Sequence, residues 1–234
     1  MNVLEEGEEE EKVKSKLIDL ESNLKNTFGA DLSCEWQVAQ GSLINGLKEV
    51  VDARQPNLVV MGTNGTSNLK QVLLGSNTVN VIAKIKVPML VIPEVAKFEN
   101  FLRKGKNKVV LATDLDALEN DSSLDLLKEI ALLIIEPKVK VLNVRPKNTH
   151  LDFNASMERN ALLSVFQPEI ESERITVFSS NVLSGINFYL NEHDDTGLVA
   201  MISRDSGQLI QKHYTREMAT HTEFPLLVLH DTKI

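Results

Sequence analysis

The chain has 234 residues, of which 42% are hydrophobic and 25% charged, as in an ordinary globular protein of one large or two small domains. Its net charge of −8 argues against a nucleic-acid-binding surface, which needs basic residues to neutralise phosphates. The single cysteine, Cys34, excludes an intrachain disulfide and a multi-cysteine metal site. No apolar run approaches the ~20 residues that span a bilayer, and no apolar signal segment opens the sequence. We therefore expect a cytoplasmic protein without nucleic-acid or membrane partners.

Helical and strand patterns alternate from the start of the chain. An acidic run, Glu5 to Glu11, leads into a helix whose apolar residues recur every three or four positions, and Gly29 is the expected helix stop. We interpret the acidic run as a solvated first turn rather than as a partner-binding tail. Cys34 to Ala39 then predicts a strand, Ser42 to Ala53 a helix and Asn57 to Met61 a second strand.

Three glycines at fixed spacing follow that strand. Two residues separate Gly62 from Gly65, nine more lead to Gly75, and Ser76 opens a helix that runs to about Ile85. Glycine tolerates φ > 0 and lets backbone N–H groups approach an anion, while a serine-capped helix N-terminus offers unpaired N–H donors. A lone Gly-x-x-Gly would favour mere turn punctuation. The long spacer, the Gly-Ser pair and the flanking strands instead indicate a phosphate-binding loop.

A strand from Met89 to Ile92 closes the first half, and Glu94 to Asn107 is a polar linker. The second half repeats the alternation of strands and helices, which predicts an α/β fold with parallel sheets flanked by helices. Its expected elements are, in chain order, Lys108 to Thr113, Leu124 to Ile135, Val139 to Val144, Ala155 to Phe166, Arg174 to Phe178, Val182 to Asn191, Gly197 to Ile202, Gln208 to Thr220 and Pro225 to His230.

Two pairs of segments reveal an internal repeat. Asn57 to Met61 matches Gly197 to Met201 at an offset of 140, and Val87 to Ile92 matches Phe224 to Leu229 at an offset of 137. We infer two copies of one unit. The predicted domains are residues 1–95, with the glycine loop, and residues 106–234, without it.

The offset also indicates that the first copy is incomplete. A counterpart of Lys108 to Leu115 would lie before Met1, so the first domain is expected to be truncated and to lack its first strand and helix and nearly all of its second strand. Three explanations stay open. The sequence is a truncated version, the protein is naturally short, or another subunit completes the sheet.

The spaced glycine pattern, together with Leu58-Val-Val-Met-Gly62 and Val87-Pro-Met-Leu-Val-Ile92, resembles the universal stress proteins. The spacing matches that family's ATP-binding signature. The resemblance implies tandem Rossmann-like domains of the adenine nucleotide alpha hydrolase type that bind ATP or another adenine nucleotide, with or without Mg²⁺. It implies that the glycine segment holds the phosphates and ribose. The residues so implicated are Met61, Gly62, Gly65, Gly75, Ser76 and Asn77.

The same resemblance implies an aspartate after the first strand and a hydrophobic residue after the second, which hold adenine. Only the second copy has them, as Asp114 and Val144. That copy has lost the glycine loop, because Ile202 stands where the first copy has Gly62, and β-branched residues resist φ > 0. We expect no ATP in the second copy.

We expect a stress-response module that binds rather than catalyses, because residues 63–76 contain no base, nucleophile, metal ligand or arginine near the expected phosphates. A slow ATPase is the enzyme alternative, and no metal site is expected. The rival from another class is a scaffold that binds no nucleotide, with the two copies forming a pseudo-dimer, alone or within a homo-oligomer. The resemblance suggests that Met89 to Ile92 and Leu226 to Leu229 pair across that interface.

Overall fold

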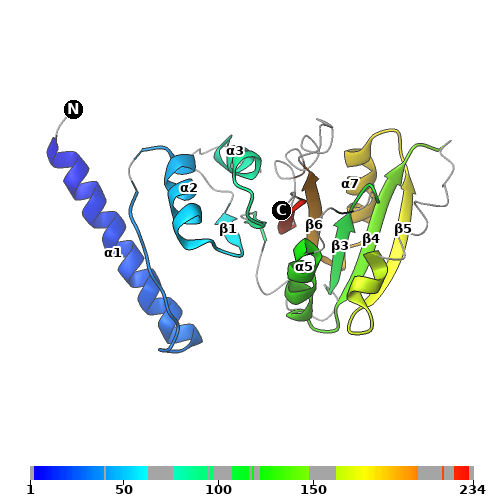
Figure 1. Cartoon of the computed structure of the whole chain (residues 1–234), viewed down its shortest axis with the longest axis horizontal. Coiled ribbons are helices and arrows are strands. Elements are labelled where there is room, and N and C mark those ends of the chain that lie inside the picture. Colours follow the sequence, from blue (N-terminus) through cyan, green and yellow to red (C-terminus); the bar gives the residue numbers. More distant parts are fainter. Residues whose placement is uncertain are drawn as a thin grey trace. The chain divides into compact units, whose positions relative to one another are not determined.

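The computed structural model describes residues 3–39, 41–62, 76–93, 95–96, 107–115, 118, 122–147, 162–204, 218 and 224–231. The chain divides into two compact units, Met1–Val50 and Val51–Ile234 (Figure 1).

The first unit contains helix α1 (Val3–Phe28) and the greater part of helix α2 (Leu43–Arg54). Gly29 ends α1 as predicted, with a φ of 114° and its N–H 2.9 Å from the carbonyl oxygen of Lys25. Ion pairs between residues four apart, such as Glu21–Lys25 at 2.6 Å, line the helix surface. No side chain described between residues 10 and 50 is buried.

The predicted strand from Cys34 to Ala39 is wrong, because residues 32–39 form neither helix nor strand. The alternation of apolar and polar residues in this segment meets only one of the two requirements of a strand. A strand also requires a neighbour that completes its backbone hydrogen bonds, and none of the described strands pairs with this segment.

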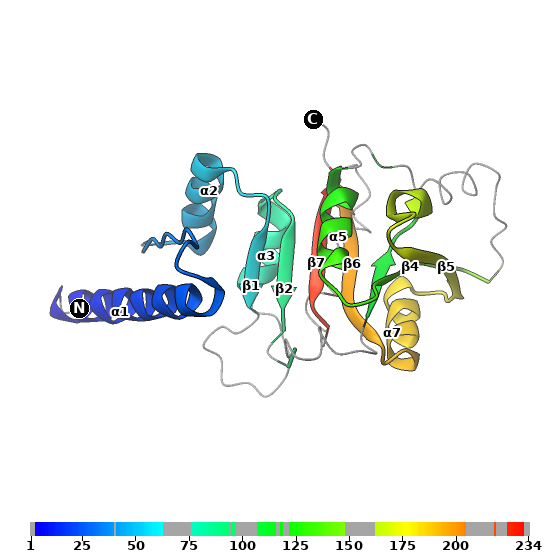
Figure 2. The same ribbon diagram turned by 90° about the horizontal axis from the view of Figure 1, so that it is seen from below.

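The second unit is built on one seven-stranded sheet of order β1-β2-β7-β6-β3-β4-β5 (Figure 2). All neighbouring strands are parallel except β2 and β7, which are antiparallel. The strands are β1 (Val59–Gly62), β2 (Met89–Ile92), β3 (Lys108–Ala112), β4 (Lys138–Arg145), β5 (Glu171–Phe178), β6 (Thr196–Arg204) and β7 (Leu226–Asp231). The predicted α/β class with a mostly parallel sheet and flanking helices is confirmed, although the strands join in a single sheet.

Besides the end of α2 and the helical residues 162–166, the described helices of this unit are α3 (Ser76–Lys84), α5 (Ser122–Leu132) and α7 (Val182–Glu192). α5 and α7 cover opposite faces of the second half of the sheet (Figure 1). Of the predicted helix Ala155 to Phe166, only residues 162–166 are described, and they are helical. The predicted helix Gln208 to Thr220 lies outside the described residues, Met218 excepted.

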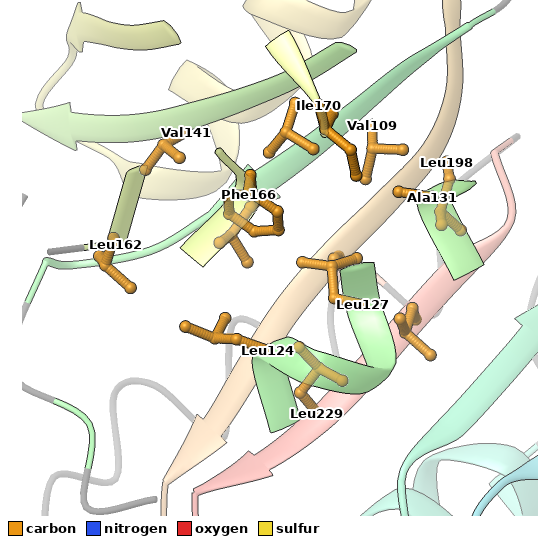
Figure 3. Close-up of a cluster of buried hydrophobic side chains, with 14 of the residues drawn as sticks. Val109, Leu124, Leu127, Ala131, Val141, Leu162, Phe166, Ile170, Leu198 and Leu229 are labelled. Atoms are coloured by element: carbon orange, nitrogen blue, oxygen red, sulfur yellow. The ribbon is translucent and has the colours of Figure 1, made fainter. Parts of the chain in front are cut away.

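The main hydrophobic core lies between the sheet and α5 (Figure 3). Leu124, Leu127 and Ala131 of α5 pack there with alternate residues of β3 and β4, because successive side chains of a strand point to opposite faces. Phe166 and Ile170, from the segment before β5, are fully buried in the same cluster. This core holds the second half of the sheet rigid and fixes the ends of its strands.

The strand pair β2–β7 joins the two halves of the sequence. β2 and β7 pair antiparallel with Leu90 opposite Leu227, as the sequence analysis predicts for these segments. The pairs β1–β2 and β6–β7 share one register, since Val59 lies opposite Met89 and Val199 opposite Leu226. These partners are related by the offsets of 140 and 137 found in the sequence.

Candidate functional site

The sheet has two carboxyl edges, because the antiparallel pair β2–β7 reverses the strand direction. β1 and β2 end at one edge, and the other five strands end at the opposite one. Ligands of parallel α/β sheets bind outside the carboxyl ends of the strands. The sheet therefore has one candidate site at each of its two carboxyl edges.

Gly62 is the last residue of β1 and lies at the first of these edges, next to the half-buried Met61. Its backbone is extended and is not among the glycines with positive φ. Among the described residues, no atom lies within 4 Å of a Cβ added to Gly62. Neither the backbone conformation nor the packing of the described residues therefore requires glycine here, which differs from the expectation of a left-handed turn.

Helix α3 brings a second predicted feature to this edge. Because β1 and β2 are parallel, the connecting helix runs back along the sheet, and its N-terminus lies at the carboxyl ends of the strands. Ser76 and Asn77 open α3, and no acidic residue occurs in its first turn. The positive end of the helix dipole thus faces the edge where β1 ends, without a carboxylate on the helix to oppose an anion.

Gly65 and Gly75 lie outside the described residues, as does the rest of the segment between β1 and α3. The structure therefore brings together the first and last parts of the predicted phosphate site, Gly62 and the start of α3.

At the opposite edge, Asp114 follows β3, the central strand of the second half. Its half-buried side chain has Oδ1 3.5 Å from Oγ1 of Thr113. The next residue, Leu115, has a φ of 69° and is only 1% exposed within the core. Its N–H donates to Oγ1 of Thr113 over 3.1 Å. A buried leucine in the left-handed region is strained, so this turn holds the backbone of Asp114 firmly.

Val144, near the end of β4, packs closely against α7. A Cβ added to Gly185 of α7 would lie 2.5 Å from Cγ1 of Val144, so glycine is required for this contact. Nδ2 of the buried Asn143 donates to the carbonyl of Thr113 at 2.9 Å, and Nε of Arg145 donates to Oδ1 of Asn143 at 2.6 Å. Sequence reasoning missed Asn143 and Arg145. Asn143 was detectable as the one polar residue in the apolar run Val141-Leu-Asn-Val144.

A cavity of about 520 Å³ lies beside the start of α7 at this edge. Asn181 caps that helix, its Oδ1 accepting the N–H of Ser184 at 2.9 Å. The residues that line the cavity are Thr176, Val177, Phe178, Ser179, Ser184, Gly185 and Phe188.

Ile202 occupies the position in β6 that Gly62 occupies in β1. Its side chain is buried, with 8% exposed, and it belongs to the main core. In the second half, the Ile202 side chain therefore occupies the position that has no side chain at Gly62 in the first half. At the offset of 137, Gly75 and Ser76 correspond to Lys212 and His213, which lie outside the described residues.

The two sets of predicted residues lie far apart. β2, β7 and β6 separate β1 from β3, and the carboxyl ends of β1 and β3 are at opposite edges of the sheet. Gly62 and Asp114 therefore cannot contact one nucleotide, as expected for residues of different halves.

Among the described residues, no three His, Cys, Asp or Glu side chains are grouped so that they could hold a metal ion. A search of the same residues finds no helix long and apolar enough to cross a membrane.

Comparison with known proteins identifies relatives of the first half. Residues 2–93 match the profile of the Universal stress protein family. A universal stress protein from Methanocaldococcus jannaschii is 31% identical over 88 residues. That alignment covers 36% of this chain and 54% of the relative, so the match spans about half the length of the relative.

Solved structures resemble a larger part of the chain. A universal stress protein from Archaeoglobus fulgidus shares 19% identity and a TM-score of 0.57, with 80% of this chain and 67% of that chain covered. A protein of unknown function from Pseudomonas aeruginosa shares 16% identity and a TM-score of 0.65, with 93% and 78% covered. At this level of identity the likeness extends to the fold alone. On the sequence matches, residues 2–93 are similar to the universal stress protein family.

Proposed function

We propose that this chain binds an adenine nucleotide, with ATP as the preferred form, at the carboxyl end of β1, and that it serves a stress response by binding rather than by catalysis. The family match in residues 2–93 and the glycine spacing of the sequence support this function. The observation that carries it is that, among the described residues, no atom lies within 4 Å of a Cβ placed on Gly62.

The argument from Gly62 is steric. Packing and backbone conformation leave room for a larger side chain at this position, yet the strand ends in glycine. A phosphate that accepts backbone N–H bonds needs that space free of a Cβ. The N-terminus of α3 adds oriented donors at the same edge, and Mg²⁺ is expected to accompany the phosphates as it does other nucleotides.

The second half is proposed to have lost triphosphate binding. Ile202 fills the position of Gly62 and is part of the core, so backbone and phosphate cannot approach each other there. The proposed adenine residues Asp114 and Val144 remain in that half, without the glycine segment beside them.

A tandem repeat explains how the two halves are related. The offsets of 140 and 137 map the pairing of β1 with β2 onto the pairing of β6 with β7. The offset of 137 also maps Leu90 onto Leu227, its own partner in the β2–β7 pair. A two-fold relation of this kind supports an intramolecular pseudo-dimer of universal stress protein domains, with the boundary near residues 95–106. A cytoplasmic location and a higher homo-oligomer belong to the same proposal.

Calorimetric titration of ATP, with Mg²⁺ present, into the chain and into Gly62→Val tests nucleotide binding. A valine side chain fits the open space, so the melting temperature of the free protein should stay nearly unchanged while ATP affinity falls by at least about tenfold, or 1.4 kcal/mol. Val60→Thr, on the same face of β1, is the matched control and should keep the affinity. Equal ATP affinity of the chain and Gly62→Val would reject the proposed site.

A further inference from the structure

The cavity of about 520 Å³ beside α7 has no part in the proposed nucleotide site. It lies along β5, the last strand of the sheet order, whose carboxyl end is at the edge opposite to that of β1. Its volume is typical of sites that bind small molecules. The described residues that line it are all uncharged, which suits a neutral ligand, because a charged ligand would lose its hydration without gaining a partner.

The outer side of β5 directs backbone hydrogen-bonding groups toward this cavity. The N–H of Ser179 donates to the carbonyl of Arg145 in β4 over 2.8 Å, so Ser179 and Val177 direct their backbone groups to β4. Thr176 and Phe178, on either side of Val177, direct theirs to the outer side, with which none of the described strands pairs. The carbonyl of Thr176 and the N–H of Phe178 are therefore an acceptor and a donor at the spacing that one residue of a parallel neighbour would bridge.

Helix α7, which packs against β4 and β5, adds an aromatic ring at the same place (Figure 1). Gly185 approaches Val144 so closely that its added Cβ would lie 2.5 Å from Cγ1, and Val177 is the partner of Val144 in β5. Phe188 follows Gly185 by three residues and lies on the same helix face. Phe188 and Phe178 both line the cavity, yet they are 63% and 54% exposed. The cavity thus offers aromatic surface next to a backbone donor and acceptor.

We propose that this cavity binds a neutral, planar ring compound with a hydrogen-bond donor next to an acceptor, as in a bicyclic lactam. The ring lies against Phe188, its N–H donates to the carbonyl of Thr176, and its oxygen accepts from the N–H of Phe178. A lactam presents both groups on one side, as a residue of a neighbouring parallel strand does. Stacking favours a flat aromatic ring over an aliphatic chain of the same size.

An extended peptide fits this site less well. Along β5 the cavity is lined only by residues 176–179, which is shorter than an ordinary strand of five or six residues. The earlier part of β5 carries Glu171 and Glu173, whose carboxylates are engaged with Lys138 and Lys140. A compact ligand therefore matches the length of the cavity better than a paired strand does.

Chemical-shift titration of the isotope-labelled full chain with carbostyril, a neutral bicyclic lactam, measures this binding by NMR. The amide signal of Phe178 should shift and saturate at millimolar carbostyril or below. N-methylcarbostyril has no N–H and leaves the carbonyl of Thr176 without that hydrogen bond, so it should bind at least about fivefold more weakly. This comparison of two ligands uses the unmodified chain.

Substitutions in α7 locate the binding. Ser184→Phe introduces a large side chain into the cavity from an exposed position, so it should reduce carbostyril affinity at least about tenfold with little change in melting temperature. Phe188→Ala removes the stacking surface and should weaken binding about fivefold, whereas Phe188→Tyr keeps the ring and should bind like the unmodified chain.

Three results would each overturn the proposal. They are no saturable shift of the Phe178 amide at millimolar carbostyril, equal affinities for carbostyril and its N-methyl derivative, and undiminished binding by Ser184→Phe. None of them bears on ATP binding at β1, because the two sites lie at opposite carboxyl edges of the sheet.

Discussion

At the scale of single residues, three lysines and three carboxylates form a charged layer near the amino ends of the strands. Lys138 pairs with Glu171 at 2.6 Å, Lys140 pairs with Glu173, and Lys108 pairs with Asp195. Only 11% of the Lys140 side chain is exposed, whereas half of Glu173 is. Desolvation on burial, and then the charge of Lys108, hold the pKa of Lys140 below its usual 10.5.

The lowered pKa of Lys140 gives a prediction with a definite sign. Between the folded-state pKa and 10.5 the unfolded chain binds more protons than the folded one, so the contribution of Lys140 to stability rises with pH in that interval. Lys140→Met removes a poorly solvated charge and should be neutral or stabilising by about 1 kcal/mol at neutral pH. Its advantage over the unmodified chain should shrink as the pH approaches 10.5.

Urea unfolding of both proteins across a pH series measures this difference. A free-energy difference that stays constant with pH, or one that grows toward pH 10.5, would contradict the lowered pKa.

The conformation of a single residue was predictable from the sequence where the residue type itself determines it. Gly29 ends α1 because glycine tolerates its φ of 114°. The strain at Leu115 and the contact of Gly185 with Val144 were not predictable, because tertiary packing imposes them on residues that have no special local signal.

At the scale of elements, the sequence pattern predicts the strands that pair with a neighbouring strand. It fails for Cys34 to Ala39, which pairs with none of the described strands. Met89 to Ile92 was predicted with the bounds of β2, since an apolar run between a proline and a polar linker has clear limits. Cys34 to Ala39 has the alternation of a strand and is not one. Its counterpart by spacing, β5, forms eight parallel pairs with β4, whereas none of the described strands pairs with Cys34 to Ala39.

The pairing of β2 with β7 places the strands of both halves in one sheet. Leu227 is fully buried in the main core and lies opposite Leu90. Leu227→Ala should therefore lower the free energy of unfolding by roughly 3 kcal/mol through lost burial and an unfilled cavity. Leu20→Ala, at a position 53% exposed on α1, is the control and should change it by less than about 0.5 kcal/mol.

Denaturant unfolding followed by circular dichroism measures both free energies. Equal small effects of the two substitutions would show that the β2–β7 pair contributes little to stability.

At the scale of the whole molecule, the sheet separates the two sets of predicted site residues. The first half keeps the glycine strand end and the start of α3, and the second half keeps Asp114 and Val144. They lie at opposite carboxyl edges. The offset of 140 predicts a loss in each half, but it does not predict that a single sheet joins the two halves, because long-range strand pairing leaves no local pattern.

The central claim is that this chain recognises a nucleotide through its phosphates, at the glycine strand end of β1. Calorimetric titration of the unmodified chain with ATP and, separately, with adenosine tests it most directly. The proposed adenine contacts Asp114 and Val144 belong to the other edge, so ATP should bind more than about tenfold tighter than adenosine. Equal affinities for the two ligands, or no binding of ATP at millimolar concentration, would contradict the claim.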